Sequence, residues 1–137
     1  MTIFLDTGVI VALDNQRDPM HKAAIEKMAQ VRSGAYGNWA YTSDYIFDES
    51  LTLSFARTGN MEISKELAKK LLAAKSLTIL HVTEDVFRES TNFYIAQYGN
   101  LSFTDCISVQ LMKENGIEYI ATFDAGFKKI PRIKVVP

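Results

Sequence analysis

The sequence is poor in the residues that build disulfides and zinc sites, with one cysteine and two histidines among 137 residues. A single cysteine cannot form a disulfide within the chain or supply the cysteine sets of structural zinc sites. The apolar runs fall short of the ~18 residues that cross a bilayer, and the N-terminus lacks the basic segment of a signal peptide. We therefore expect a cytoplasmic protein with no membrane segment that folds without disulfides.

The remaining composition is that of an ordinary globular protein. Fifteen Lys and Arg against sixteen Asp and Glu give a formal charge of −1, so the total charge does not mark a nucleic-acid binder. Apolar residues make up 47% of the chain, which excludes a disordered chain. We find no repeat and no flexible linker, and we assign residues 1–137 to a single domain.

Short apolar segments alternate with longer segments of helical periodicity. The predicted strands cover residues 3–5, 39–42, 77–82, 118–123 and 133–136. The predicted helices cover residues 18–33, 43–58, 62–75, 84–98 and 102–115, with a short helical segment at 9–13. Asp6-Thr7-Gly8 reads as a turn, and Asp18-Pro19 as the start of a helix. This alternation indicates an α/β fold with a mostly parallel sheet of four to five strands and helices on both faces.

Four acidic residues belong at one edge of this sheet. Asp6 and Asp124 follow the first and fourth predicted strands, Glu49 lies in the helix after the second strand, and Asp105 lies in the first turn of a helix. Ligands of parallel sheets bind beyond the carboxyl ends of the strands. We therefore treat these four acids as candidate site residues.

Three of the four acids also have a structural interpretation that stays open. Asp6 suits a side-chain turn before Gly8, and Asp124 suits a cap on the turn that follows it. Ser102-x-x-Asp105 has the spacing of a capping box at a helix N-terminus. Taken singly, each of these residues is as well explained by local structure as by chemistry.

Glu49 is chosen over its neighbour Asp48 because of the helix face on which it lies. Its neighbours one turn away on either side are Tyr45, Ile46, Thr52 and Leu53, which are mostly apolar. A carboxylate on an apolar face costs several kcal/mol unless another group compensates it. Asp48 shares its face with Asp44 and fits a solvated first turn.

Taken together, the four acids predict a cation site. Converging carboxylates with no adjacent Lys or Arg repel one another and raise their own pKa values. Oxygen ligands suit Mg²⁺ or Mn²⁺, which support phosphate chemistry. Hydroxyl side chains that could orient the acids flank them: Thr7, Ser102, Thr104 and Thr122. For Thr122 and Ser102 we favour ordinary capping and turn roles.

The segments that hold these acids resemble the motifs of the PIN-domain ribonuclease family, which includes the VapC-type toxins of toxin–antitoxin systems. The segments are Phe4-Leu-Asp-Thr-Gly-Val9, Asp44-Tyr-Ile-Phe-Asp-Glu-Ser-Leu51, Leu101-Ser-Phe-Thr-Asp105 and Ala121-Thr-Phe-Asp-Ala-Gly-Phe127. Asp18-Pro-Met-His21 also resembles the segment that often follows the first strand in these toxins. The resemblance covers nearly the whole chain, in the right order.

The resemblance implies a three-layer α/β/α sandwich and an endoribonuclease that depends on Mg²⁺ or Mn²⁺. It implies that Asp6, Glu49 and Asp105 are the primary metal-site and catalytic acids, with Asp124 as an additional one. The implied partners are an RNA substrate, a cognate antitoxin protein and a second copy of the chain in a homodimer. Without the four acids the chain has fifteen basic and twelve acidic residues, and that positive remainder suits a polyanionic substrate.

The alternative is a catalytically silent PIN-like module that binds RNA or protein, because a fold does not fix a function. A phosphatase with an aspartyl nucleophile is disfavoured, since its second Asp would stand where the chain has Gly8.

Other side chains have less direct interpretations. His21 reads as a solvated or capping residue, His81 as part of a buried strand and Cys106 as a packed apolar side chain. The aromatic residues around the second strand suit either base stacking or packing at a core or dimer interface: Tyr36, Trp39, Tyr41 and Tyr45. The basic C-terminal stretch suits either RNA phosphates or solvent: Lys128, Lys129, Arg132 and Lys134.

Overall fold

A parallel sheet organises the chain, which a computed structural model describes over residues 2–37 and 39–137. The strands of the described residues are β1 (Ile3–Leu5), β2 (Ala40–Ser43), β3 (Leu77–Leu80), β4 (Tyr119–Ala121) and β5 (Lys134–Val135). Their order is β3-β2-β1-β4-β5, and every neighbouring pair is parallel. The predicted parallel sheet of four to five strands is therefore confirmed.

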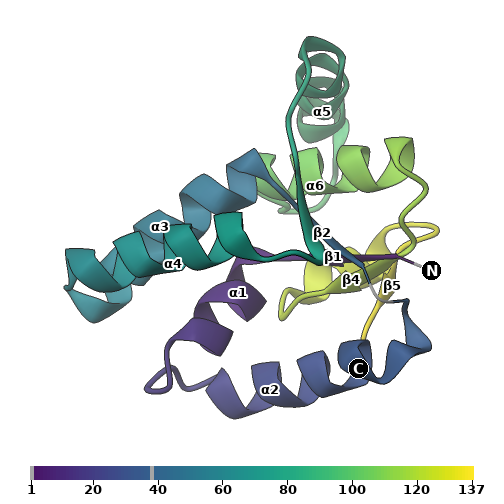
Figure 1. Cartoon of the computed structure of the whole chain (residues 1–137). Coiled ribbons are helices and arrows are strands. Elements are labelled where there is room, and N and C mark those ends of the chain that lie inside the picture. The colour runs from purple at the N-terminus through teal and green to yellow at the C-terminus, as the bar shows by residue number, and fades with distance from the viewer. Residues whose placement is uncertain (1, 38) are drawn as a thin grey trace.

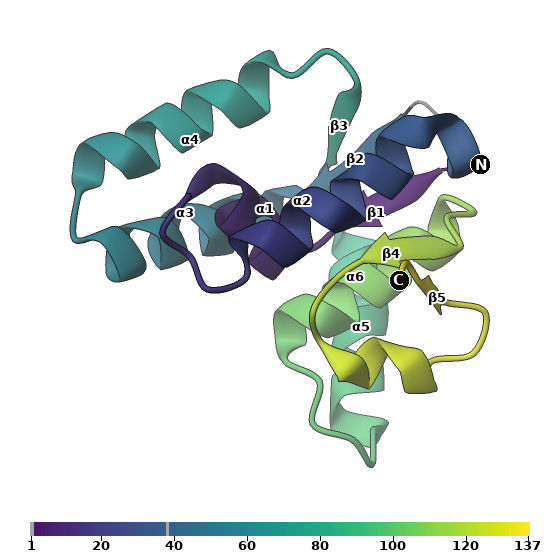
Figure 2. The same ribbon diagram turned by 90° about the horizontal axis from the view of Figure 1, so that it is seen from below.

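Helices cover the sheet on both faces. The helices of the described residues are α1 (Thr7–Asp14), α2 (His21–Gln30), α3 (Asp44–Thr58), α4 (Met61–Ala73), α5 (Glu84–Ala96) and α6 (Phe103–Glu114), with a π-helical turn at Val31–Ala35 and a 3₁₀ turn at Ala125–Lys129. Figures 1 and 2 show α2 across one face of the sheet and α6 on the other. The predicted α/β/α sandwich is confirmed, and the α3–α4 hairpin projects beyond the strands.

The central strand β1 is apolar at every position because it is covered on both sides. Ile3 and Phe4 have no exposed surface, and β1 pairs with β2 on one side and β4 on the other. A strand buried on both faces reads as a continuous apolar run rather than an alternating one. This position brings the residue after β1, Asp6, to the middle of the sheet edge.

The junction between α3 and α4 follows from the local sequence. The Ser43 hydroxyl caps α3 by accepting a hydrogen bond from the Ile46 N–H (3.0 Å). Gly59 ends the helix with a φ of +64°, a left-handed conformation that favours glycine. The Asn60 side chain then accepts from the Glu62 N–H (3.0 Å) and begins α4. The predicted limits of α3 are confirmed.

Two predicted element starts are wrong. Asp6-Thr7-Gly8 makes no separate turn, because α1 begins at Thr7 with Asp6 as its N-cap. Helix α2 begins at His21 rather than at Asp18. One carboxylate oxygen of Asp18 accepts from the Met20 N–H (2.8 Å) and the other binds Arg57, so Asp18 forms a turn ahead of the helix.

Most other differences lie at element ends. Trp39 precedes β2, and β3, β4 and β5 are each shorter than predicted. Among the described residues, no helix is both long and apolar enough to cross a membrane.

Candidate active site

The four predicted acids come from four elements that meet at the carboxyl edge of the sheet. Asp6 directly follows β1, and Asp124 lies three residues after the neighbouring strand β4. Glu49 lies in the second turn of α3, and Asp105 lies in the first turn of α6. We call these residues the four edge acids.

Asp6 is held by hydrogen bonds at both carboxylate oxygens. The Thr7 N–H donates to Oδ1 (2.9 Å), and the Thr122 hydroxyl donates to Oδ2 (2.6 Å). The Thr122 hydroxyl in turn accepts from the Asp124 N–H (3.0 Å). One buried hydroxyl therefore connects Asp6 to the segment that carries Asp124. Its bond from the Asp124 N–H is the turn role expected for Thr122, and its bond to Asp6 is an additional role.

Glu49 faces α1, whereas Asp48 faces solvent. The Thr7 hydroxyl donates a hydrogen bond to the Glu49 carboxylate. Glu49 is half-buried and Asp48 is exposed. Thr7 therefore contacts two of the edge acids, through its N–H to Asp6 and its hydroxyl to Glu49.

Asp105 has a structural role as well as a place at the edge. It accepts from the Ser102 N–H (3.0 Å), and its own N–H donates to the Ser102 hydroxyl (3.1 Å). This reciprocal pair is a complete capping box, as the spacing predicts. Asp124 likewise caps its turn, because its Oδ1 accepts from the Gly126 N–H (2.8 Å).

Burial and mutual repulsion raise the pKa values of two edge acids. Burial raises the pKa of Asp6, its two hydrogen bonds lower it, and the charges of Glu49 and Asp124 raise it again. Burial raises the pKa of Asp105 to about 6, with smaller increases from Asp6 and Asp124. These mutual effects show that the four carboxylates share one electrostatic environment.

No basic side chain of the described residues forms an ion pair with any edge acid. Such a set of carboxylates fits Mg²⁺ or Mn²⁺ by the chemistry of its oxygen atoms and by its lack of a compensating cation. As placed in the described residues, no three His, Cys, Asp or Glu side chains could hold one metal ion together. The donor set therefore fits the ion in kind, while its side chains are not positioned as ligands of one ion.

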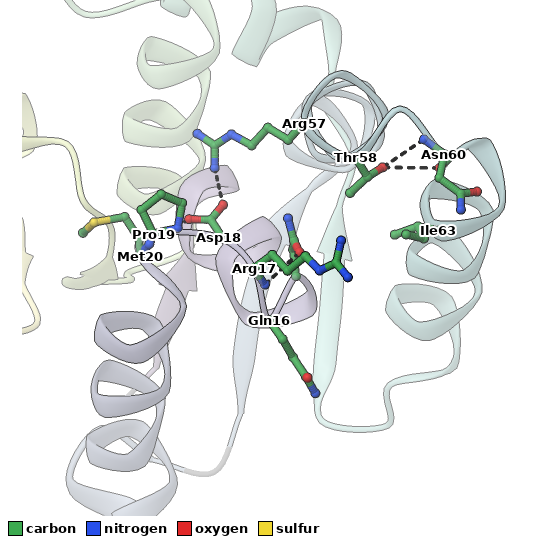
Figure 3. A pocket seen from close by; sticks show the side chains of 10 residues that line it. Gln16, Arg17, Asp18, Pro19, Met20, Arg57, Thr58, Asn60 and Ile63 are labelled. Atoms are coloured by element: carbon green, nitrogen blue, oxygen red, sulfur yellow. Dashed lines mark hydrogen bonds and ion pairs between the residues drawn. The ribbon is translucent and has the colours of Figure 1, made fainter.

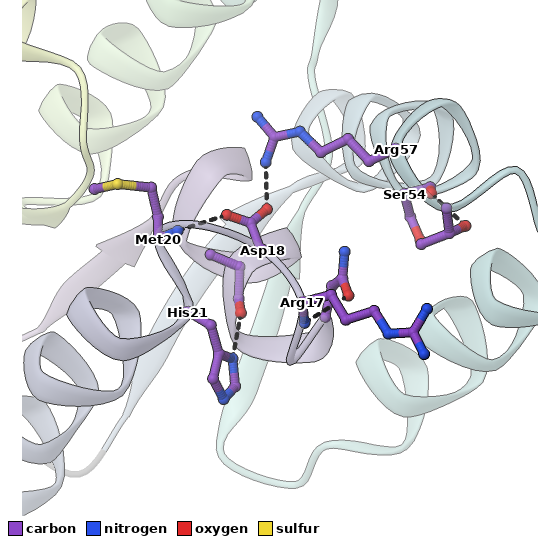
Figure 4. A network of polar contacts seen from close by, with 9 residues as sticks. Arg17, Asp18, Met20, His21, Ser54 and Arg57 are labelled. Atoms are coloured by element: carbon purple, nitrogen blue, oxygen red, sulfur yellow. Dashed lines mark hydrogen bonds and ion pairs between the residues drawn. The ribbon is translucent and has the colours of Figure 1, made fainter.

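A separate hollow of about 900 Å³ lies between the α1–α2 loop and the α3–α4 junction (Figure 3). None of the edge acids lines it. Figure 4 shows Arg57 and the backbone of Met20 both directed at Asp18. The Arg57 Nη1 lies 2.5 Å from Asp18 Oδ2, and the Asp18 side chain is only 1% exposed. This hollow surrounds a structural ion pair rather than the edge acids.

The two histidines and the cysteine lie outside the group of edge acids. His21 Nδ1 lies 2.7 Å from the Ala12 carbonyl oxygen and connects α2 to α1. The prediction that His81 belongs to a buried strand is wrong, because β3 ends at Leu80 and the His81 side chain is 79% exposed. Cys106 is buried as predicted, and burial raises the pKa of its thiol to about 11.

An aromatic cluster that sequence reasoning missed lies beside Asp105. The ring of Phe103, two residues before Asp105, packs against Tyr45, Phe87 and Tyr94, with centroids 6.3, 5.4 and 5.9 Å away. Phe87 and Tyr94 are each nearly half exposed. Of the aromatic residues singled out earlier, only Tyr45 joins this cluster, whereas Tyr36 packs on Tyr119.

Comparison with known proteins completes the description of the site. The sequence profile of the PIN domain matches residues 3–133. A search of curated protein sequences gives no match. The chain is similar in structure to Mycobacterium tuberculosis VapC20, a toxin that cleaves the sarcin–ricin loop, with a TM-score of 0.85, 26% identity and coverage of 98% of this chain and 99% of that one.

It also resembles a chain of VapBC2 from Rickettsia felis, solved bound to a DNA fragment from its promoter. That match has a TM-score of 0.64, 17% identity and coverage of 98% of this chain and 97% of that one. At this identity the second match shows the fold alone.

Proposed function

The chain belongs to the PIN domain family, and from this premise we propose that it is a metal-dependent endoribonuclease, the toxin of a toxin–antitoxin pair. The observation that carries the proposal is the group of edge acids, which share one environment and pair with no basic side chain of the described residues. Repulsion between four such acids lowers the stability of the fold. A purely structural module would gain nothing from keeping them together.

Each edge acid has a defined part in this proposal. Asp6, Glu49 and Asp105 would hold Mg²⁺ or Mn²⁺ as primary ligands, with Asp124 as an additional one. A bound divalent cation would lower the pKa of a coordinated water and offset negative charge on the phosphoryl group. The substrate is an RNA phosphodiester, which approaches a group of carboxylates only when a cation lies between them.

Neighbouring hydroxyl groups position these acids. The Thr122 hydroxyl fixes one oxygen of Asp6, and the Thr7 hydroxyl fixes Glu49. The capping box of α6 limits the movement of Asp105. Such contacts orient metal-binding carboxylates, and their loss typically lowers metal affinity or activity about 10- to 100-fold.

The partners follow from the relatives and from the exposed surface. The relation to VapC20, a toxin, supports a cognate antitoxin as the binding partner. Exposed apolar side chains along α5 support a homodimer: Phe87, Tyr94 and Ile95. Exposed apolar surface of this kind marks protein contacts. We place the protein in the cytoplasm, where its RNA substrate is.

The test is RNA cleavage with and without a divalent cation. The first RNA to try is a sarcin–ricin loop hairpin, the target named for VapC20, beside a hairpin of scrambled sequence. We expect cleavage in Mg²⁺ or Mn²⁺, none in EDTA and none with Asp6→Asn. The matched control is Asp48→Asn, which removes an exposed carboxylate one residue from Glu49.

Cleavage that persists in EDTA, or full activity of Asp6→Asn, would overturn the proposed chemistry. Tight RNA binding without cleavage under any of these conditions would identify the chain as a silent binding module instead.

A further inference from the structure

A second pocket opens on the carboxyl edge of the sheet beside Asp124. It has a volume of about 440 Å³, and its lining includes Thr122, Phe123 and Asp124 from the segment after β4. Lys27 of α2 and Lys128 of the 3₁₀ turn line it as well. Thr122 is the residue whose hydroxyl binds Asp6, so this pocket is continuous with the environment of the edge acids.

Lys27 is held in place although it comes from a distant part of the chain. Its Nζ donates to the Val136 carbonyl (2.6 Å) and lies 5.5 Å from the centroid of the Phe123 ring. Figure 1 shows the C-terminus beside α2, as this contact requires. One donor direction of the ammonium group is thus used by Val136, and the others remain available to a ligand.

Lys27 and Lys128 line the same pocket, and burial, followed by the charge of Lys128, lowers the pKa of Lys27. Neither forms an ion pair with any acid of the described residues. By contrast, Lys134 of the same C-terminal stretch lies 3.6 Å from Glu118. An anion between Lys27 and Lys128 would relieve their repulsion.

We propose that the Lys27–Lys128 pocket binds an RNA backbone phosphate next to the one at which cleavage occurs. This inference rests on the proposed function. An RNA strand that presents one phosphate to the edge acids must place neighbouring phosphates beside them. On the Asp124 side, the pocket offers two cations to receive such a phosphate. Both lysines act as positioning residues, because they contact the substrate away from the reacting atoms.

RNA binding is measured with Asp6→Asn as the background, so that the strand is not cut. The probe is a fluorescein-labelled single-stranded RNA of twelve nucleotides, titrated over a series of KCl concentrations. Lys27→Met and Lys128→Met should each weaken binding several-fold and lower the log–log salt slope by about 0.7, the value for one single-strand phosphate contact. Lys27→Arg retains the charge and should keep the slope of the background protein.

The matched control is Lys75→Met, which removes an exposed lysine just before β3 at the opposite edge of the sheet. Because Lys27 also holds the Val136 carbonyl, melting temperatures identify any variant that is unfolded. Lys128 is exposed, so Lys128→Met tests the pocket even if Lys27→Met fails to fold. Salt slopes equal to that of Lys75→Met in both lysine variants would overturn the inference.

Two further measurements separate this inference from the proposed function. With otherwise wild-type protein and Mg²⁺, the lysine variants should raise KM and leave kcat unchanged, since the contact is the same in the ground and transition states. Titration with inorganic phosphate alone should shift the amide resonances of Phe123 and Lys128 in the wild type and not in the Lys27→Met, Lys128→Met double variant. Phosphate binding without RNA cleavage would refute the ribonuclease and keep the pocket. Cleavage with unchanged KM in both variants would refute the pocket and keep the ribonuclease.

Discussion

Asp6 and Asp18 are both buried carboxylates that accept a backbone N–H, yet their surroundings differ in one respect. Asp18 is 6% exposed and has the Arg57 guanidinium as its counter-charge. Asp6 is 7% exposed and has only hydroxyl and amide donors, with further carboxylates nearby. A buried acid with its own cation has its charge compensated within the fold, whereas a buried acid without one can take a cation from solution. The comparison distinguishes a structural carboxylate, Asp18, from one suited to metal binding, Asp6.

The largest expected difference between the edge acids and the Asp18–Arg57 pair is in RNA cleavage. Asp6→Asn, Glu49→Gln and Asp105→Asn should each lower kcat/KM on the order of 100-fold or more, as the loss of a charge-stabilising group does in other enzymes. Asp48→Asn should leave most of the activity. Cleavage rates under single-turnover conditions measure this effect. If Asp48→Asn were inactive and Glu49→Gln active, the assignment of the α3 face would be wrong.

The next effect is the loss of stability when Arg57 is removed. Arg57→Met leaves the Asp18 carboxylate buried without a partner, and we expect a cost of about 2 kcal/mol in the free energy of unfolding. That lies below the 3–5 kcal/mol typical of fully buried pairs, because the Arg57 side chain is 44% exposed. Urea unfolding measures it, with Lys65→Met, which breaks a surface pair with Glu62, as control. Equal midpoints for the two variants would show that the Asp18–Arg57 pair adds nothing.

In metal-free protein, Asp6→Asn should raise the free energy of unfolding, whereas Arg57→Met lowers it. The single carbonyl oxygen of asparagine can still accept from the Thr7 N–H, while its amide nitrogen faces the Thr122 hydroxyl as a donor instead of an acceptor. The substitution also removes one of the repelling charges. We expect a gain of roughly 1 kcal/mol in EDTA, the usual exchange of activity for stability at functional sites. Urea unfolding in EDTA again provides the measurement. A loss of stability instead would make Asp6 a structural N-cap of α1.

A divalent cation should stabilise the wild type more than Asp6→Asn. A ligand that binds only the folded state stabilises it in proportion to RT ln(1 + [L]/Kd), about 1.4 kcal/mol at ten times Kd. Melting temperatures in EDTA and in excess Mg²⁺ show the difference, with Asp18→Asn as a control that removes a buried acid away from the edge. Equal responses of wild type and Asp6→Asn would remove Asp6 from the metal site.

A further effect is the pH dependence of stability that Asp105 contributes. The pKa of Asp105 is raised to about 6 in the folded protein from an ordinary value near 3.8. Its folded form therefore binds a proton more readily than its unfolded form, so metal-free stability from this group is greatest below pH 3.8 and falls as the pH rises through about 6. Asp105→Asn should flatten this part of the stability curve. Identical curves for the two proteins would show that Asp105 does not titrate in this range.

The local sequence predicts those features of the fold that depend on contacts between residues close together along the chain. The apolar run of β1, the Ser43 and Gly59 limits of α3 and the capping box of Asp105 all depend on neighbours a few residues away. The choice of Glu49 over Asp48 depends on helix periodicity and agrees with their observed exposure. The alternation of strands and helices likewise predicts that the four acids lie at one edge of the sheet.

The sequence fails to predict features that depend on contacts with residues far away along the chain. Asp18 begins no helix because its carboxylate binds Arg57, which is 39 residues away in sequence. Lys27 reaches the sheet edge through Val136, 109 residues away. No local pattern marks either contact. The bond from the Thr122 hydroxyl to Asp6 has no local signal either, because the two residues are 116 positions apart.

The central position of β1 also governs when the protein can become active during its own synthesis. β1 is made first, but it needs β4 as a neighbour, and Asp6 needs the Thr122 hydroxyl that follows β4. A ribosome adding about 5–20 residues per second therefore makes almost the whole chain before these contacts can form. A nascent chain that ends between α6 and β4 carries Asp6, Glu49 and Asp105 but still lacks Asp124. Translation itself thus keeps the four acids apart until the polypeptide is nearly finished.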